Sequence, residues 1–266
     1  MNKAEKARRE AASVYELALR DTPLGRLDPL CKLFMTLFYI GMVISFHKYD
    51  ITGLFFMLLF PVIGYQAALL PVRTCFYRLR YVMPLVCAVG VLNPFFDREV
   101  LLTLGRLHIT GGVISMLTLM MKGIFSLMAS FLLMATTRIE DLCRALRRIH
   151  VPKTIVSLLL LTFRYTDVLL EQVSVMTDAY HLRAPRQKGI AFKAWGSFLG
   201  QLLLRSVDRA DALYDSMILR GFHGEFHYVV QAKTSRYSIL WLLLFAVAVT
   251  ASRLYNVPVL ISGIFR

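Results

Sequence analysis

The sequence predicts an all-α integral membrane protein, with about five transmembrane helices and a cytoplasmic coupling domain of long amphipathic helices. Of its 266 residues 57% are hydrophobic, yet the formal net charge is +14. Apolar runs alternate with basic blocks, as they do in membrane proteins whose cytoplasmic segments are positive. A nucleic-acid-binding protein would carry its charge on a polar domain, so we expect a lipid bilayer and no nucleic acid as partner.

Residues 1–29 are predicted to form a cytoplasmic lead-in. A helical stretch at 14–19 is broken at 22–25. Leu27-Asp28-Pro29 then predicts a helix start, because aspartate accepts free backbone N–H groups and proline suits the first helical turn. The chain does not open on a short basic region leading into an apolar core, so we expect no cleaved signal peptide.

Residues 30–136 are predicted to form a membrane domain with four spans. The apolar runs lie at 33–46, 51–70, 81–96 and 111–135. The second and fourth are long enough to cross a hydrocarbon core of roughly 30 Å. Pro84 and Pro94 allow the third to be kinked or partly re-entrant. A final span, with its apolar run at 238–252, is predicted in the last part of the chain, residues 236–266.

Residues 137–235 are predicted to form the cytoplasmic coupling helices. The stretch 136–142 has the hydroxyl-then-acid pattern of a capping box and predicts a short helix that stops before Pro152. Residues 152–183 and 188–220 follow as two long segments. Apolar and charged residues alternate along them at three- and four-residue steps, which indicates amphipathic helices.

The short loops predict the orientation of the chain. Arg73, Arg78 and Arg80 lie between the second and third spans, whereas the link between the first two carries the single Lys48. Positive loops stay in the cytoplasm. We therefore expect a multi-pass protein of a bacterial or archaeal cell membrane, with both long helices on the cytoplasmic side.

A repeated motif ends both long helices. Asp178 and Asp215 each begin the pattern Asp-x-x-x-Leu-Arg-small. The candidate site residues are the three that close each copy: Leu182, Arg183, Ala184, Leu219, Arg220 and Gly221. One interpretation is capping, since a cation at a helix C-terminus gains ~0.3–1 kcal/mol and glycine commonly follows a helix end. The other is that each guanidinium binds carboxylates in an acidic groove of a soluble partner.

Several other residues have two interpretations each. Lys122, in the middle of the fourth run, could mark a transport pathway or face a polar bundle interior. Histidines and an acid flank the arginines and could ligate a metal or be solvated loop groups: His181, His223, Glu225 and His227. The methionines of the fourth run fit helix packing better than a soft-metal path. The four cysteines have no metal-like spacing, and we expect them reduced.

No motif for catalysis is present. The sequence has no Gly-rich Lys loop for nucleotide phosphates, no Gly-x-Ser-x-Gly and no His-Glu-x-x-His. We therefore expect no catalytic residues, no resident metal and no cofactor.

From about residue 24 to 254 the order of parts resembles the transmembrane coupling (T) component of energy-coupling-factor transporters. The resemblance is carried by Leu27-Asp28-Pro29, by the linker from Thr136-Thr137 through Glu140-Asp141-Leu142 to Val151-Pro152, and by the two Leu-Arg-small motifs. The sequence of residues 180–185, Tyr-His-Leu-Arg-Ala-Pro, is similar to the sequence at this position in the cobalt/nickel branch of the family.

The resemblance implies a non-enzymatic part of an ATP-driven importer. Two ATP-binding-cassette ATPases would bind the coupling helices, one at each arginine, and a separate substrate-binding membrane (S) subunit would receive the motion. A T component serving vitamin-type S subunits is an alternative. An autonomous membrane carrier would need polar residues or broken helices at mid-membrane. An integral-membrane enzyme would need clustered Asp, Glu or His at a membrane face.

Overall fold

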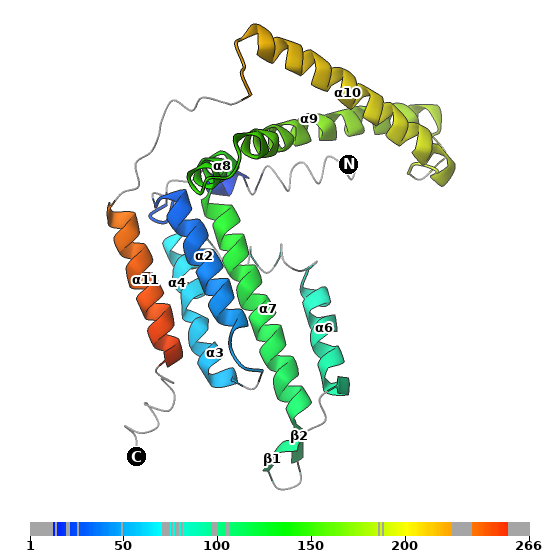
Figure 1. The fold of residues 1–266 in the computed structure, drawn as a ribbon. Helices are drawn as coiled ribbons and strands as arrows, with labels where there is room; N and C mark the ends of the chain where they lie inside the picture. Colours follow the sequence, from blue (N-terminus) through cyan, green and yellow to red (C-terminus); the bar gives the residue numbers. More distant parts are fainter. Residues whose placement is uncertain are drawn as a thin grey trace. The chain divides into compact units, whose positions relative to one another are not determined.

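The chain divides into two compact units in the computed structural model. The long-helix unit comprises Met1–Leu17 and Arg138–Ala232, and the bundle unit comprises Ala18–Thr137 and Lys233–Arg266 (Figure 1). The structure describes residues 13, 15–19, 22–25, 27–48, 50–70, 75, 77, 80, 82–96, 100–104, 107–185, 187, 189–224 and 236–254. Each unit is described by itself.

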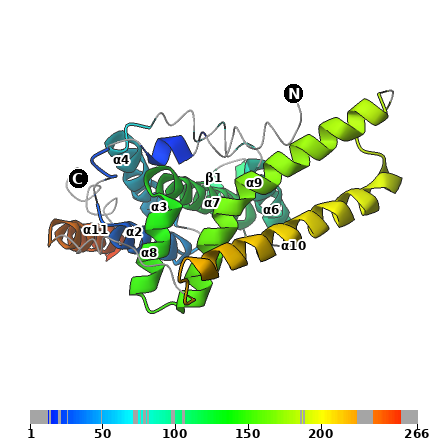
Figure 2. The ribbon, with the colours of Figure 1, turned by 90° about the horizontal axis from the view of Figure 1, so that it is seen from above.

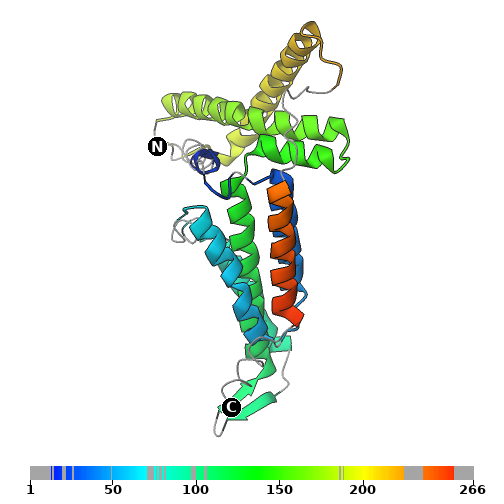
Figure 3. The same cartoon turned by 90° about the vertical axis from the view of Figure 1, so that its left-hand side faces the viewer.

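The bundle unit is organised around one long helix. Its elements are α2 (Pro29–Ile44), α3 (Ile51–Met57), α4 (Leu59–Ala67), α6 (Met83–Phe96), α7 (Gly111–Thr136) and α11 (Arg236–Leu254). Helix α7 contacts α2, α3, α4 and α6, and α11 packs on α2 and α3 (Figures 1 and 3). Residues of α2, α3, α7 and α11 share one buried apolar cluster. Each of these helices therefore has one face turned to the bundle interior.

Small residues let neighbouring helices approach α7 closely. A Cβ at Gly64 of α4 would lie 2.4 Å from Leu132 Cδ2, and one at Gly123 of α7 would lie 2.5 Å from Val86 Cγ1. Between helices in lipid, close backbone approach replaces the hydrophobic driving force available in water. A side chain at Gly64 would have to displace the Leu132 side chain, and one at Gly123 that of Val86.

The predicted start of the first span is confirmed. The Asp28 carboxylate accepts the Leu30 N–H at 3.1 Å, and Pro29 occupies the first turn of α2. The Asp28 N–H in turn donates to Ser238 Oγ at 3.2 Å. The Leu-Asp-Pro sequence thus both begins α2 and contacts the start of α11.

The second apolar run, 51–70, forms two helices, α3 and α4, that meet at Leu58. Pro61 has no N–H and cannot bond to the Met57 carbonyl four residues earlier. That carbonyl instead accepts the hydroxyl of fully buried Tyr39 at 2.7 Å. A side chain of α2 therefore satisfies the backbone group that the break leaves free.

A small hairpin lies between α6 and α7, which the all-α prediction did not include. Strand β1 (Val100–Leu104) pairs antiparallel with β2 (Leu107–Thr110), and Leu104 lies opposite Leu107. In the sequence the two apolar runs are separated by Gly105 and Arg106. Two such runs with a two-residue Gly-x link favour a tight hairpin.

Two lysines connect α2 and α7 at their opposite ends. Lys32 Nζ of α2 donates to the carbonyl of Thr136, the last residue of α7, at 2.8 Å, and to Gly25 O at 3.2 Å. Lys122 Nζ of α7 donates to the carbonyl of Ile44, the last residue of α2, at 3.2 Å, and to Phe46 O. Each helix thus supplies an ammonium to the free carbonyls at the end of the other, a favourable position for a cation.

Two described helices are long and apolar enough to cross a membrane on their own. They are Gly112–Thr136 in α7 and Arg236–Arg253 in α11. Residues Pro29–Ile44 and Gly53–Ala67 form shorter apolar stretches. The number of five spans therefore stays a prediction.

The long-helix unit contains α8 (Ile139–Arg148), α9 (Lys153–Arg183), the short 3-10 helix η1 (Phe192–Ala194) and α10 (Trp195–Leu219). Helix α8 packs on α9, and α10 runs back across α9 (Figure 2). The predicted first long helix, 152–183, is confirmed. The second long helix begins at Trp195, directly after η1, and its predicted start at Lys188 lies outside the described residues.

The predicted capping box at 136–142 is wrong. Arg138 is the N-cap of α8 and makes no side-chain cap bond. Thr136 Oγ1 bonds back to the Leu132 carbonyl at 2.7 Å, and Glu140 Oε1 accepts the Tyr15 hydroxyl at 3.1 Å. The Thr136 hydroxyl and the Glu140 carboxylate thus bond to other residues, and the two reciprocal bonds of a capping box are not formed.

We predict that Lys122→Met destabilises the bundle unit by about 1–3 kcal/mol, because the carbonyls of Ile44 and Phe46 lose a charged donor. Thermal unfolding of the full chain in detergent measures this. Lys193→Met, at an exposed position of η1, is the matched control and should leave the midpoint unchanged. Equal midpoints for the two variants would refute the capping role of Lys122.

Tyr39→Phe should also lower the stability of the bundle unit by about 1–3 kcal/mol, because the buried Met57 carbonyl loses its donor while packing is kept. Tyr237→Phe, with the tyrosine 61% exposed on α11, is the control. Thermal unfolding of the full chain in detergent tests this prediction. An unchanged midpoint for Tyr39→Phe would show that the Met57 carbonyl has another partner.

Candidate functional site: two arginine-bearing helix ends

The first motif closes α9 without a left-handed residue. Arg183 is the last residue of the helix, and the C-cap Ala184 has φ −130° and ψ 64°. The Ala184 N–H bonds to the Tyr180 carbonyl at 2.9 Å. Pro185 follows, has no N–H to continue the helix, and so ends it. The guanidinium therefore sits on the final turn of a 31-residue helix.

The second motif closes α10 with a Schellman cap. Arg220 is the C-cap and Gly221 has φ +78°. The Phe222 N–H bonds to Met217 O at 2.9 Å and the Gly221 N–H to Ile218 O at 2.9 Å, which is the bond pair of that motif. The capping interpretation is thus confirmed for Gly221, whose backbone makes the cap. The Arg220 side chain is not needed for it.

Both motifs present their side chains to solvent. Arg183 and Arg220 are exposed, and within the described part of the chain neither guanidinium has a hydrogen-bonded or ion-paired partner. The preceding leucines are among the most exposed apolar side chains, Leu182 at 84% and Leu219 at 88%. An exposed leucine next to an unpaired arginine is a combination that a protein partner can bury.

The two motifs lie at opposite ends of the α9–α10 pair (Figures 1 and 2). The Tyr180 hydroxyl near the end of α9 accepts the N–H of Ala191, just before η1 and α10, at 3.3 Å. Helix α10 thus starts beside Arg183 and carries Arg220 away from it along its whole length. A 25-residue helix is about 37 Å long. One small ligand cannot bind both guanidinium groups.

The two helices touch little and expose much apolar surface. Arg205 Nη1 of α10 donates to Gln172 Oε1 of α9 at 3.2 Å. No residue of α10 is buried. Its exposed large apolar side chains include Leu203, Leu204 and Tyr214, each at least 60% exposed. A helix that exposes this much apolar surface offers a face on which a partner protein can pack.

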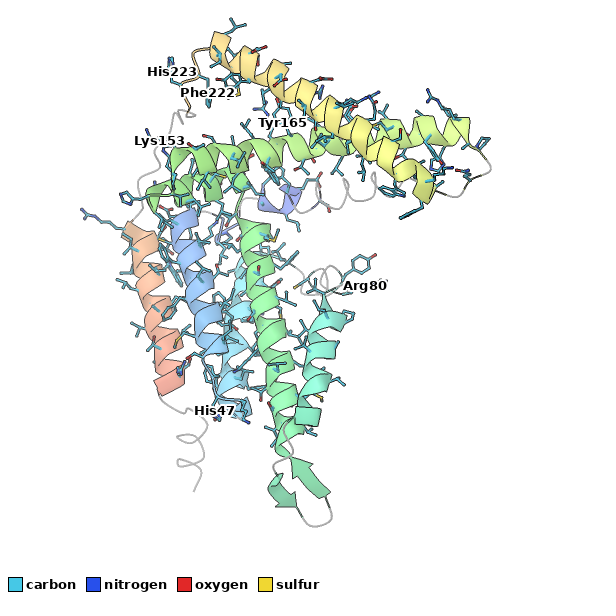
Figure 4. All side chains as sticks on the ribbon, turned by 45° about the vertical axis from the view of Figure 1, so that its right-hand side comes forward. His47, Arg80, Lys153, Tyr165, Phe222 and His223 are labelled. Atoms are coloured by element: carbon cyan, nitrogen blue, oxygen red, sulfur yellow. The ribbon has the colours of Figure 1, made fainter. Side chains whose placement is uncertain are left out.

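The other candidates do not form a site with the arginines. Lys122 bonds to the end of α2 and so faces the bundle interior. Phe222 and His223 lie at the end of α10 (Figure 4). Glu225 and His227 lie outside the described residues. Among those described, no group of three His, Cys, Asp or Glu side chains could hold a metal ion. None of the four cysteines, Cys31, Cys75, Cys87 and Cys143, is in a disulfide bond.

Within the long-helix unit, Tyr15 near the start of the chain contacts both α8 and α9. Tyr15 packs its ring 6.3 Å from that of Phe163 and donates to Glu140. Burial, and then the hydrogen bond to Glu140, raise the pKa of Tyr15. Burial, and then the Glu140 charge, also raise the pKa of the Cys143 thiol. Both groups are therefore neutral at physiological pH, and Cys143 is a poor nucleophile.

A family model described as CbiQ, cobalt transport protein, matches residues 20–229. The chain belongs to this family. The matched stretch includes both arginine motifs and Leu27-Asp28-Pro29, so the resemblance to the T component of energy-coupling-factor transporters is confirmed. The chain is a membrane transport component of the CbiQ family.

Two relatives are similar in sequence to the chain. An uncharacterised protein of Methanocaldococcus jannaschii is 22% identical over 227 residues, which cover 82% of this chain and 76% of that protein. The cobalt transport protein CbiQ of Rhodobacter capsulatus is 33% identical over 96 residues, or 35% of this chain and 38% of that protein. The second match spans well under half of either protein.

Sequence reasoning missed the residues that shape the first motif. The helical periodicity of the sequence assigns neither Tyr180 nor Gln187 a role at this helix end. In the structure Tyr180 donates to Gln187 Oε1 at 2.6 Å and accepts the Ala191 N–H. The available signal was a tyrosine one turn before the arginine, but its partners lie in an irregular connection that periodicity does not describe.

Gly221→Ala and Gly200→Ala should change stability in opposite directions. A Cβ at either position meets nothing within 4 Å, but only Gly221 has positive φ. The alanine at 221 should cost about 1 kcal/mol, and the one at 200, inside α10, should gain about the same. Limited proteolysis of the full chain, read at α10, measures both. Equal effects would contradict the Schellman end.

Proposed function

We propose that the chain is the transmembrane coupling component of an energy-coupling-factor importer, and that it carries no catalytic site. The observation that supports this most is the pair of exposed Leu-Arg ends at opposite ends of α9 and α10. Each end offers one unpaired guanidinium and one exposed leucine. Such a pair suits two separate contacts with two copies, or two close relatives, of one partner.

The partners at these ends are two ATP-binding-cassette ATPases. Each guanidinium enters an acidic groove of one ATPase, where its planar fork binds carboxylate oxygens bidentately. The leucine beside it packs on the rim of the groove. When the ATPases close on nucleotide, the two grooves move relative to one another, and the helices change their crossing.

The partner on the open apolar faces is a substrate-binding membrane subunit. Helix α10 buries none of its own residues, and α9 exposes Leu158 at 63% and Val175 at 56%. A membrane subunit with an apolar surface would cover these side chains and follow their movement. The motion would reach the substrate in this way, without a substrate site in the chain itself.

The protein sits in the cell membrane as a multi-pass chain with its long helices in the cytoplasm. Helices α7 and α11 supply two spans, and α2, α3 with α4, and α6 supply the others. Arg80 lies at the end of the bundle unit where α2 begins, and His47 at the end where α2 stops (Figure 4). The basic loop at Arg73, Arg78 and Arg80 favours the cytoplasm for the first of these ends.

The transported ion is cobalt or nickel. The family description, cobalt transport protein, supports this over a vitamin-type substrate. An autonomous carrier is less well supported, since the mid-helix Lys122 bonds to the carbonyls of α2 and not to a vacant polar site. The α3–α4 break likewise has its free carbonyl bonded by Tyr39.

Arg183→Ala and Arg220→Ala should each reduce cobalt uptake by about tenfold or more, because an acidic groove is left without its cation. Co-purification of the ATPases should fall in parallel, while membrane insertion stays normal. Arg209→Ala, at an exposed position of α10, is the matched control. Full uptake and full ATPase association in both single variants and in the double variant would refute the proposal.

A further inference from the structure

The corner between α9 and α10 is held by one side chain. The Tyr180 hydroxyl donates to Gln187 Oε1 at 2.6 Å and accepts the Ala191 N–H at 3.3 Å. The Tyr180 carbonyl also accepts the Ala184 N–H. One residue therefore contacts the beginning, the middle and the end of the connection 184–191.

The first arginine end needs this support because its backbone cap is weak. At α10 two bonds and a glycine in the left-handed region fix the chain after Arg220. At α9 the Ala184 N–H bonds back into the helix, Pro185 has no N–H to offer, and no other backbone N–H among the described residues of the connection bonds to a carbonyl of α9. The remaining described bond within the connection is short-range, from the Gln187 N–H to the Ala184 carbonyl at 3.1 Å. The Tyr180 side chain supplies the links that the backbone lacks.

Tyr180 lies close enough to Arg183 along α9 to influence the position of the Arg183 side chain. The two residues are three apart on a helix, so their side chains lie on neighbouring positions of one face. A tyrosine has few rotatable bonds and holds a position at low entropic cost. Its bond to Ala191 joins the turn bearing Arg183 to the residue that precedes η1 and α10. The first arginine end and the start of the helix bearing the second are thereby joined.

We propose that Tyr180 is a positioning residue for Arg183, and that it makes the end of α9 and the start of α10 one rigid corner. This inference rests on the proposed function, since it assumes that Arg183 docks into an ATPase. Movement of an ATPase at Arg183 is then passed directly to the start of α10. Without the hydroxyl the Arg183 end pivots on its own, and part of the movement is lost.

The test uses the full chain in lipid nanodiscs and the ATPase subunits that co-purify with the wild-type chain. Tyr180→Phe keeps the ring and removes the hydroxyl, and Gln187→Met removes the acceptor. We expect either change to weaken ATPase binding by roughly 3–10-fold, the worth of one or two hydrogen bonds. Tyr237→Phe, at an exposed position of α11 outside the long-helix unit, is the control and should bind normally.

The decisive comparison is made in two arginine backgrounds. If Tyr180 acts through Arg183, Tyr180→Phe has no further effect on ATPase binding in Arg183→Ala, but its full effect remains in Arg220→Ala. A residue that only stabilises the fold would weaken binding equally in both backgrounds, and that result overturns the positioning role. Loss of binding by Arg183→Ala, with no effect of Tyr180→Phe in the wild-type background, overturns it as well.

A second measurement needs no partner. Hydrogen exchange of the full chain should be faster in Tyr180→Phe across residues 184–191 and unchanged across residues 217–222, which the Schellman cap holds. Unchanged hydrogen exchange at residues 184–191 would contradict the claim that Tyr180 makes this corner rigid. Should Arg183→Ala leave ATPase binding and cobalt uptake intact, the positioning role falls; the proposed function falls with it if Arg220→Ala and the double variant also keep full binding and uptake. If Tyr180→Phe weakens ATPase binding equally in the Arg183→Ala and Arg220→Ala backgrounds, the positioning role falls and the proposed function stands.

Discussion

Unpaired backbone carbonyls at helix ends are the constraint on which the bundle unit depends. In apolar surroundings each free carbonyl is costly, and side chains of neighbouring helices bond to them. Lys32 of α2 bonds to the end of α7, and Lys122 of α7 bonds to the end of α2. Tyr39 of α2 bonds to the carbonyl that Pro61 leaves free in the α3–α4 break. These long-range bonds fix how far each helix extends along its neighbour, so the same groups set both the length and the register of the bundle.

The long-helix unit closes its helices in a different way. Backbone groups and Tyr180 provide the caps, and the arginines at both ends keep their guanidinium groups unpaired among the described residues. A cation that is not used as a cap is available for another protein. Lys32 and Lys122 of the bundle unit bond within the fold, whereas Arg183 and Arg220 are exposed. This contrast supports the proposal that the two arginines bind other proteins.

Local signals in the sequence predicted the features that depend on local chemistry. Asp28 and Pro29 begin a helix, Gly221 follows one, and α9 runs to Arg183 as its periodicity indicates. Two features that local signals did not show depend on groups distant in the chain. Glu140 bonds to Tyr15 instead of forming a capping box, and the partner of Lys122 lies more than 70 residues away, at Ile44. The site was predicted as far as its arginines, but the bonds that shape the first end cross an irregular loop and have no periodic signature.

Site-specific cross-linking measures the central claim most directly. A photo-reactive amino acid at Leu182 or at Leu219, the exposed residues beside the arginines, would report what each end touches in the assembled transporter. The account predicts that both positions cross-link to ATPase subunits, and that a chain labelled at both captures two of them. Cross-links from either position solely to a membrane subunit or to lipid would contradict it.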